Sequence, residues 1–306
     1  MARAILIAGP TASGKSGLAL RLAERVGGVV INADSMQVYK ELRILTARPG
    51  PEEEARAPHA LYGFVAAHDN YSAGRFAADA ATAIADAERA GLRPIIVGGT
   101  GLYFKALLEG LSPMPPVPEE IRAHWRAEAA KAEPGALHRF LMQRDPEMGE
   151  RLSPSDTQRT VRALEVLEAT GRSLRAWQQL PREPVLDEAE TVRLVLAPDR
   201  AELYRRIDQR FAAMMEAGAI EEAQQLQGLK LAPTLPIIGT LGLRPLLRHL
   251  AGEIGLEEAV ERAQTETRQY AKRQLTWLIR NMIAWNRIAE QEMQKQTMSA
   301  IAFIDS

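Results

Sequence analysis

The sequence predicts an α/β protein with a mostly parallel sheet flanked by helices and an all-helical insertion domain. Apolar runs typical of buried strands occur at residues 4–8, 29–34, 94–97 and 191–196. Helical patterns separate these runs, and such alternation is typical of parallel strands joined by right-handed crossovers. Residues 112–118 contain four prolines and predict a stiff connector, and residues 119–179 then carry helical patterns without a convincing strand. We therefore expect a core of residues 1–112 and 185–306 around a helical insertion of residues 113–184.

The first apolar run leads into a phosphate-binding loop. Gly9, Gly14, Lys15 and Ser16 have the spacing of a P-loop, and an amphipathic helical pattern follows them. Backbone N–H groups of such a loop and the positive end of its helix bind anions. We expect Lys15 to neutralise a phosphate oxygen and the Ser16 hydroxyl to ligate Mg²⁺. The core is therefore expected to be P-loop NTPase-like. The alternative for this loop is a simple glycine turn between a strand and a helix. The predicted phosphate and nucleotide site comprises Gly9, Pro10, Thr11, Ala12, Ser13, Gly14, Lys15 and Ser16.

A carboxylate ends the second apolar run. Asp34 follows residues 29–33, and the carboxyl ends of parallel strands meet at one edge of a sheet. We expect Asp34 on the same side as the P-loop, as a general base. A structural cap, or a carboxylate that holds a magnesium-bound water, is the alternative.

Composition limits the class of protein. The 306 residues are 46% apolar and 25% charged, enough for a large core, and no apolar run approaches the roughly 20 residues of a membrane span. The N-terminus enters a strand without a signal peptide, so we expect a soluble cytoplasmic protein. The absence of cysteine excludes disulfides and thiolate zinc sites. Because the net charge is −1, binding to nucleic acid would require local basic surface.

Basic residues recur on the predicted helices. Most arginines of the insertion are expected on solvated faces, but Arg159 and Arg162 lie three residues apart on one face after a helix-start signal. Arg268, Lys272 and Arg273 near the end are either surface charges or RNA phosphate contacts. Around them, an apolar stripe is expected in the core: Leu275, Leu278, Ile279, Met282 and Ile283.

Five blocks together resemble the tRNA dimethylallyltransferase family, also called tRNA isopentenyltransferases (IPP transferases). The blocks occur in the family's order and span nearly the whole chain, at residues 9–16, 34–39, 98–103, 156–166 and 267–277. A P-loop alone is generic, whereas this set is highly specific.

The resemblance implies transfer of a dimethylallyl group from dimethylallyl diphosphate to N6 of adenosine 37 in tRNA, with Mg²⁺ and release of diphosphate. It implies that Asp34 is the base, that Thr11 and Lys15 position the diphosphate, and that Arg210 lies near it. Residues implied to bind tRNA are Asp34, Ser35, Met36, Gln37 and Thr100, with Arg122, Gln158, Arg159, Thr160, Val161 and Arg162 from the insertion. We expect a monomer.

Three positions depart from the family pattern. Arg48 replaces a usual lysine, Ser155 replaces a usual asparagine, and residues 241–245 lose a usual tyrosine and acid. From the residues alone a small-molecule kinase that binds ATP, a GTPase switch and a non-catalytic RNA-binding protein remain alternatives. The GTPase is disfavoured because no Asn-Lys-x-Asp or Asp-x-x-Gly motif occurs.

Overall fold

The computed structural model describes residues 3–305. The chain divides into two compact units, one formed by Met1–Leu108 with Val185–Ser306 and the other by Glu109–Pro184. The insertion expected at residues 113–184 lies within the second unit. Each unit is described by itself below.

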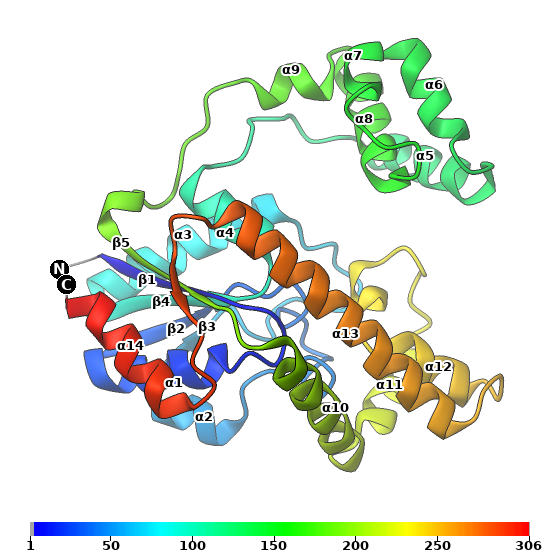
Figure 1. The fold of residues 1–306 in the computed structure, drawn as a ribbon. Helices are drawn as coiled ribbons and strands as arrows, with labels where there is room; N and C mark the ends of the chain where they lie inside the picture. The colour runs from blue at the N-terminus through cyan, green and yellow to red at the C-terminus, as the bar shows by residue number, and fades with distance from the viewer. Residues whose placement is uncertain (1–2, 306) are drawn as a thin grey trace. The chain divides into compact units, whose positions relative to one another are not determined.

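A six-stranded parallel sheet forms the centre of the first unit (Figure 1). The strand order is β3-β2-β4-β1-β5-β6, and every neighbouring pair is parallel. The strands are β1 (Ala4–Ala8), β2 (Gly28–Asn32), β3 (His59–Ala60), β4 (Arg93–Gly98), β5 (Thr191–Leu196) and β6 (Asn286–Ile288). The predicted fold class is confirmed. The short strands β3 and β6 add to the four apolar runs expected from the sequence.

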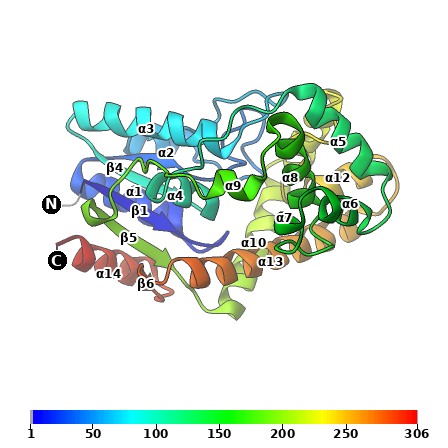
Figure 2. The ribbon, with the colours of Figure 1, turned by 90° about the horizontal axis from the view of Figure 1, so that it is seen from above.

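Both faces of the sheet are covered because the central strands are apolar on both sides. In β1, Ile5 and Ile7 face one cluster of buried side chains and Leu6 faces the other, as the period of two in a strand requires. Helices α1 (Lys15–Val26) and α14 (Met293–Asp305) lie on the first face, and α3 (Ala73–Arg89) and α4 (Gly101–Leu108) lie on the second (Figures 1 and 2). The small helix α2 spans Pro51–Arg56.

The last third of the chain is mainly helical. Its elements are α10 (Arg200–Glu216), α11 (Ala219–Gly228), α12 (Leu243–Leu250) and α13 (Leu256–Asn281), with 3₁₀ turns at Glu188–Glu190 and Pro236–Gly239. The apolar stripe expected at residues 275–283 is wrong in part. Leu278 and Met282 are buried, but Ile279 is 41% exposed and Ile283, which lies beyond the end of α13, is 79% exposed. The buried face instead passes through small and polar side chains: Ala259, Ala263, Thr267, Ala271, Gln274 and Leu278. Small residues let neighbouring helices approach closely, so the face of α13 that carries them is the buried one.

The second unit is all-helical in its described elements and has its own core. It contains α5 (Glu119–Lys131), α6 (Ala136–Arg144), α7 (Pro146–Gly149), α8 (Thr157–Thr170) and α9 (Leu174–Gln178). Trp125, Leu141 and Leu164 are among the buried side chains of this unit. Within residues 3–305, no helix has both the length and the apolar character to cross a membrane.

Gly98 marks a close approach between β4 and the chain after β2. A Cβ atom at this position would lie 2.0 Å from the carbonyl oxygen of Ala33, and a backbone atom cannot shift as easily as the end of a side chain. We expect Gly98→Ala to lower the free energy of unfolding by about 1–3 kcal/mol, measured by urea denaturation. Gly228→Ala is the control, since nothing lies within 4 Å of a Cβ there. Equal stability of the two variants would contradict this packing.

Candidate active site

The P-loop joins β1 to α1 in a tight conformation. Gly14 has φ +92° and Ala12 has φ +62°, and the backbone N–H of Ser13 donates to the Pro10 carbonyl oxygen at 3.2 Å. Gly9 permits a close contact, because a Cβ there would lie 2.6 Å from Ser13 Oγ. The loop therefore wraps tightly around the N-terminus of α1, where N–H groups are available to an anion.

Asp34 is held rigidly at the carboxyl end of β2. The fully buried Asn32 accepts from the Asp34 backbone N–H at 2.8 Å and donates to the carbonyl oxygens of Asp34 and Leu61, each at 3.0 Å. The backbone N–H of Met36 donates to Asp34 Oδ1 at 2.9 Å. Because the backbone and one carboxylate oxygen are both held, the Asp34 side chain has a defined direction.

A cavity of about 270 Å³ brings the P-loop and Asp34 together. Thr11, Asp34, Ser35, Met36 and Arg210 line it, as do Thr46, Gly239, Thr240, Thr267, Tyr270, Arg273 and Gln274 and an apolar group formed by Leu45, Ile207, Phe211, Met214 and Leu241. The cavity thus has a charged part and an apolar part within one space.

Two of the residues expected to bind tRNA make hydrogen bonds within the protein. The Gln37 side-chain amide donates to the carbonyl oxygens of Thr46 and Ala47, at 2.9 and 3.0 Å. Thr100 Oγ1 accepts from the Ser35 backbone N–H at 3.1 Å. Neither residue is among those that line the cavity, but each forms a hydrogen bond to the backbone of a residue that does, Thr46 or Ser35.

Two cations at the P-loop, Lys15 and Arg210, both lie in the field of one carboxylate, Asp34. Burial lowers the pKa of Lys15 from 10.5 to about 8; the negative charge of Asp34 opposes this shift and the positive charge of Arg210 adds to it. Burial also lowers the pKa of Arg210, again against the effect of Asp34. Lys15 Nζ donates to the Pro10 carbonyl oxygen at 3.3 Å, and Arg210 donates to Thr11 Oγ1. With two cations and one nearby anion, the site favours an additional negative charge.

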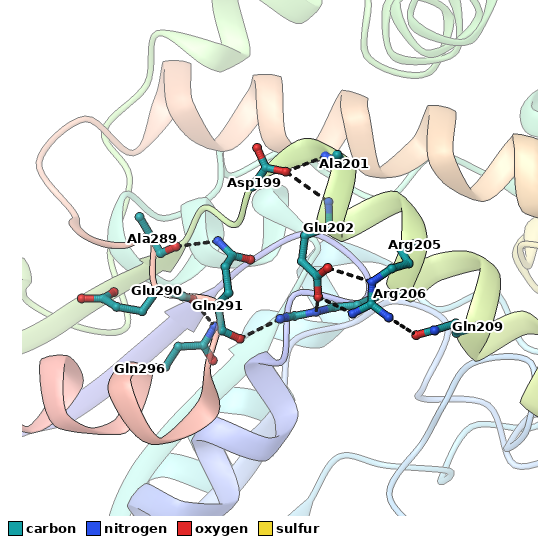
Figure 3. A network of polar contacts seen from close by, with 10 residues as sticks. All are labelled: Asp199, Ala201, Glu202, Arg205, Arg206, Gln209, Ala289, Glu290, Gln291 and Gln296. Atoms are coloured by element: carbon teal, nitrogen blue, oxygen red, sulfur yellow. Dashed lines mark hydrogen bonds and ion pairs between the residues drawn. The ribbon is translucent and has the colours of Figure 1, made fainter.

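A polar network fixes the helix that carries Arg210 (Figure 3). Asp199 caps α10 by accepting from the backbone N–H groups of Ala201 and Glu202, at 2.9 and 3.1 Å. Hydrogen bonds from Arg205 and Arg206 lower the pKa of Glu202 to about 2. Arg206 also donates to the Gln291 carbonyl oxygen at 2.6 Å, which ties α10 to the segment before α14. Arg210 therefore projects from a helix anchored at both its first turn and its middle.

Sequence reasoning missed two polar residues of the site on α13. The Gln274 side chain accepts from the Thr11 backbone N–H and donates to the Gly99 carbonyl oxygen, both at 2.9 Å, so it joins the P-loop to the loop after β4. Tyr270 lines the cavity, and burial raises the pKa of its phenol to about 12. The available signal was the helical spacing of Thr267, Tyr270 and Gln274, which places all three on one face.

The departure at residues 241–245 lies in the cavity wall and the core behind it. Leu241 lines the cavity, whereas Leu243 is fully buried and Arg244 is exposed. Gly242 has φ +81° and a Cβ there would lie 2.7 Å from Phe211. The segment therefore packs closely against the apolar part of the cavity without the usual tyrosine and acid.

The predicted tRNA-binding residues of the insertion differ in exposure. Gln158 and Arg159 are exposed on α8, and Arg159 pairs with Asp156 at 3.0 Å. Arg162 pairs with Glu165 at 3.1 Å, and Arg122 on α5 is within 4.0 Å of Glu119. Thr160 is 1% exposed and donates to the Asp156 carbonyl oxygen, and Val161 packs against the core of this unit. Thr160 and Val161 thus stabilise the helix that presents the arginines.

The basic residues of α13 lie at different places. Arg268 pairs with Asp208 at 2.5 Å, which ties α13 to α10. Arg273 lies over the Tyr270 ring, 5.8 Å from its centroid, at the cavity. Lys272, Arg273 and Arg280 line a shallow groove with Trp277. This groove has the cation and aromatic groups that RNA backbones and bases contact.

The donor set at the P-loop suits Mg²⁺ bound mainly by a substrate. Within the described part of the chain, no group of three or more His, Cys, Asp or Glu side chains could hold a metal ion. Ser16, on the first turn of α1, supplies a hydroxyl oxygen of the type that Mg²⁺ accepts. Substrate phosphate oxygens and water would provide the remaining ligands, as is usual for Mg²⁺ at P-loops.

The parallel sheet, the P-loop between β1 and α1 and the carboxylate after β2 define a P-loop NTPase-like α/β protein. Comparison with known proteins narrows this class. The family described as IPP transferase matches residues 37–282, and the family described as isopentenyl transferase matches residues 2–64. The chain belongs to the IPP transferase family, that of the tRNA dimethylallyltransferases.

Individual relatives match nearly the whole of this chain. The tRNA dimethylallyltransferase of Parvibaculum lavamentivorans is 54% identical over 303 residues, covering 99% of this chain and 96% of the relative. The crystal structure of the full-length tRNA isopentenylpyrophosphate transferase from Bacillus halodurans has a TM-score of 0.72 at 31% identity, covering 100% of this chain and 96% of that one. A eukaryotic dimethylallyltransferase acting on tRNA has a TM-score of 0.81 at 29% identity, covering 99% of this chain and 77% of that one.

The lowered pKa of Lys15 predicts a pH dependence of stability. Between pH 8 and 10.5 the unfolded chain holds a proton at Lys15 that the folded chain has lost, so stability should rise with pH in this window. Relative to Lys15→Met, the wild type should gain up to about 1.4 kcal/mol of unfolding free energy per pH unit. Urea denaturation of both proteins at several pH values measures this. A difference that does not change with pH would contradict the burial of a charged Lys15.

Proposed function

We propose that the protein transfers a dimethylallyl group from dimethylallyl diphosphate to N6 of adenosine 37 in tRNA and releases diphosphate. Family membership supports the activity and the tRNA substrate. The observation that carries the finer assignment is the single cavity in which Asp34, the P-loop residue Thr11 and an apolar wall meet. A diphosphate, an allylic chain and an adenine amine have to meet at such a place.

The P-loop would bind the diphosphate of the donor. Lys15 and Arg210 are both buried enough for their pKa values to fall, and a bound anion would raise these pKa values and stabilise the charged forms. As the C–O bond to the allylic carbon breaks, negative charge grows on the diphosphate, and these fixed cations stabilise it. Thr11, which already accepts from Arg210, would help to orient the group. Mg²⁺ held by Ser16 would supply further charge neutralisation.

The apolar side of the cavity would hold the dimethylallyl chain. Leu45, Ile207, Phe211, Met214 and Leu241 form this side, and they lie in the same space as Arg210 and Asp34. An apolar wall keeps water away from the carbon that carries positive charge during transfer, which limits hydrolysis.

Asp34 would act on the adenine amine. The exocyclic nitrogen is a weak nucleophile because its lone pair is delocalised, so a carboxylate that accepts its proton helps the transition state. The Met36 N–H holds one oxygen of this carboxylate, which fixes its direction. The base must leave the anticodon stack to reach the cavity. Ser35 and Met36 line the cavity beside Asp34 and would contact it there.

A single assay tests the proposal. The purified protein is incubated with dimethylallyl diphosphate, Mg²⁺ and an anticodon stem-loop with adenosine at position 37, and the nucleosides are analysed by mass. We expect a gain of one dimethylallyl group on that adenosine, and loss of the reaction when EDTA removes Mg²⁺. ATP turnover with a small acceptor, without modification of the RNA, would support a kinase instead.

Replacement of the proposed base should slow the chemical step. We expect Asp34→Asn to lower kcat by about 10²- to 10⁴-fold with little change in tRNA affinity, because the amide cannot accept the proton. Single-turnover rates and a binding isotherm separate the two effects. The exposed Asp69 provides the control variant Asp69→Asn, for which the rate should be normal. Normal prenylation by Asp34→Asn would remove Asp34 from this role.

The insertion should contribute to tRNA binding through phosphate contacts. We expect the double variant Arg159→Gln/Arg162→Gln to weaken tRNA binding and to reduce the slope of log Kd against log salt concentration by about 1 to 2. Arg159 pairs with the N-cap residue of α8, Asp156, and Arg162 pairs with Glu165, so the tRNA has to compete with these two carboxylates. Arg139→Gln/Arg144→Gln on α6 is the control pair. An unchanged salt slope in the α8 variant would contradict the assignment.

A further inference from the structure

We propose that Glu222 is a positioning residue of the transfer reaction, because its carboxylate holds the loop that forms one wall of the cavity. This inference rests on the proposed function of that cavity. Glu222 lies on α11, is 7% exposed, and belongs to no motif noted in the sequence. It does not line the cavity itself, so its effect must pass through the loop.

Three consecutive backbone N–H groups converge on this one carboxylate. The N–H groups of Arg43 and Ile44 donate to Glu222 Oε1 at 2.6 and 2.8 Å, and the N–H of Leu45 donates to Oε2 at 2.8 Å. Successive N–H groups that point to one side form a concave site for an anion. Here the anion is a side chain of the protein, from an element about 180 residues later in the chain.

The same loop is held from its carbonyl side by Gln37. The Gln37 amide donates to the carbonyl oxygens of Thr46 and Ala47. Residues 43–47 lie outside any helix or strand. Glu222 binds the N–H groups of the first three of these residues, and Gln37 binds the carbonyl oxygens of the last two. A loop without regular structure keeps one conformation only when such contacts satisfy its backbone.

The held loop reaches the site directly. Leu45, whose N–H binds Glu222, and the next residue, Thr46, both line the cavity with Asp34 and Met36. If the loop moved, the space beside Asp34 would change shape, and the acceptor and the allylic chain would lose their alignment. A misplacement of about 1 Å can lower a rate by about 10²-fold.

The variant Glu222→Gln is the sharpest test because it keeps the size of the side chain. An amide offers one oxygen acceptor and two N–H donors, so at least one loop N–H would face a donor. Loss of a charge-assisted acceptor should free the loop and leave the P-loop untouched. Glu221→Gln is the matched control, since Glu221 is the neighbouring and exposed acid of the same helix.

The experiment combines hydrogen exchange with kinetics in the full-length protein. In Glu222→Gln we expect amide exchange in the peptide covering residues 42–47 to accelerate about 10-fold or more. We also expect kcat for prenylation of the stem-loop to fall by about 10- to 100-fold, with KM for dimethylallyl diphosphate within about 2-fold of wild type. Glu221→Gln should change neither readout. If Glu222→Gln does not fold, Glu222→Asp, which keeps the charge but is one methylene shorter, should show the same pattern more weakly.

The possible outcomes distinguish a positioning role of Glu222 from a purely structural one. Normal kcat in a Glu222→Gln protein with a lowered Tm would mean that Glu222 only stabilises the fold, and it would overturn the proposal. Unchanged exchange at residues 42–47 would overturn it as well. If the wild type itself does not prenylate RNA, the proposed function fails, whereas the exchange measurement still tests whether Glu222 holds the loop.

Discussion

Two cations that lack full hydration lie at the P-loop opposite a single carboxylate, and the rest of the site depends on this imbalance. Burial lowers the pKa values of Lys15 and Arg210, and the charge of Asp34 only partly opposes this. A bound anion would supply the negative charge that this group of residues lacks. Under the proposed function, the same carboxylate would lie beside the cations that hold the leaving diphosphate and would also accept a proton from the attacking amine. Diphosphate binding and base catalysis would then be electrostatically linked through Asp34.

Much of the protein serves to keep these three groups in place. Asn32 and the Met36 N–H fix Asp34, the Gln274 amide fixes the P-loop against the loop after β4, and the network at the start of α10 fixes the helix that carries Arg210. Each contact joins segments that are distant in sequence or lie at the end of a strand. In an open parallel sheet the loops after the strands are irregular, so side-chain hydrogen bonds have to define their conformation.

The sequence predicted those features that local physics decides. The P-loop spacing, the strand alternation and the carboxylate after the second strand follow from short-range patterns, and the family resemblance followed from motif order. The buried face of α13 was predicted only in part, because Leu278 is buried as expected whereas Ile279 is exposed. An apolar stripe and a stripe of small residues are equally compatible with a helix, and only the neighbouring helices select one. Gln274, Tyr270 and Glu222 were missed since their partners lie far away in the chain. The strand β6 has three residues, too few for a periodic signal.

The central claim is that one cavity holds the donor diphosphate and the acceptor amine on either side of the allylic carbon. A crystal structure with a non-hydrolysable thio analogue of dimethylallyl diphosphate, Mg²⁺ and an anticodon stem-loop tests it most directly. The account predicts diphosphate density against Lys15, Thr11 and Arg210, with N6 of an unstacked adenosine within hydrogen-bond distance of Asp34. An adenine bound elsewhere, or a diphosphate outside the P-loop with Asp34 turned away from both ligands, would contradict it.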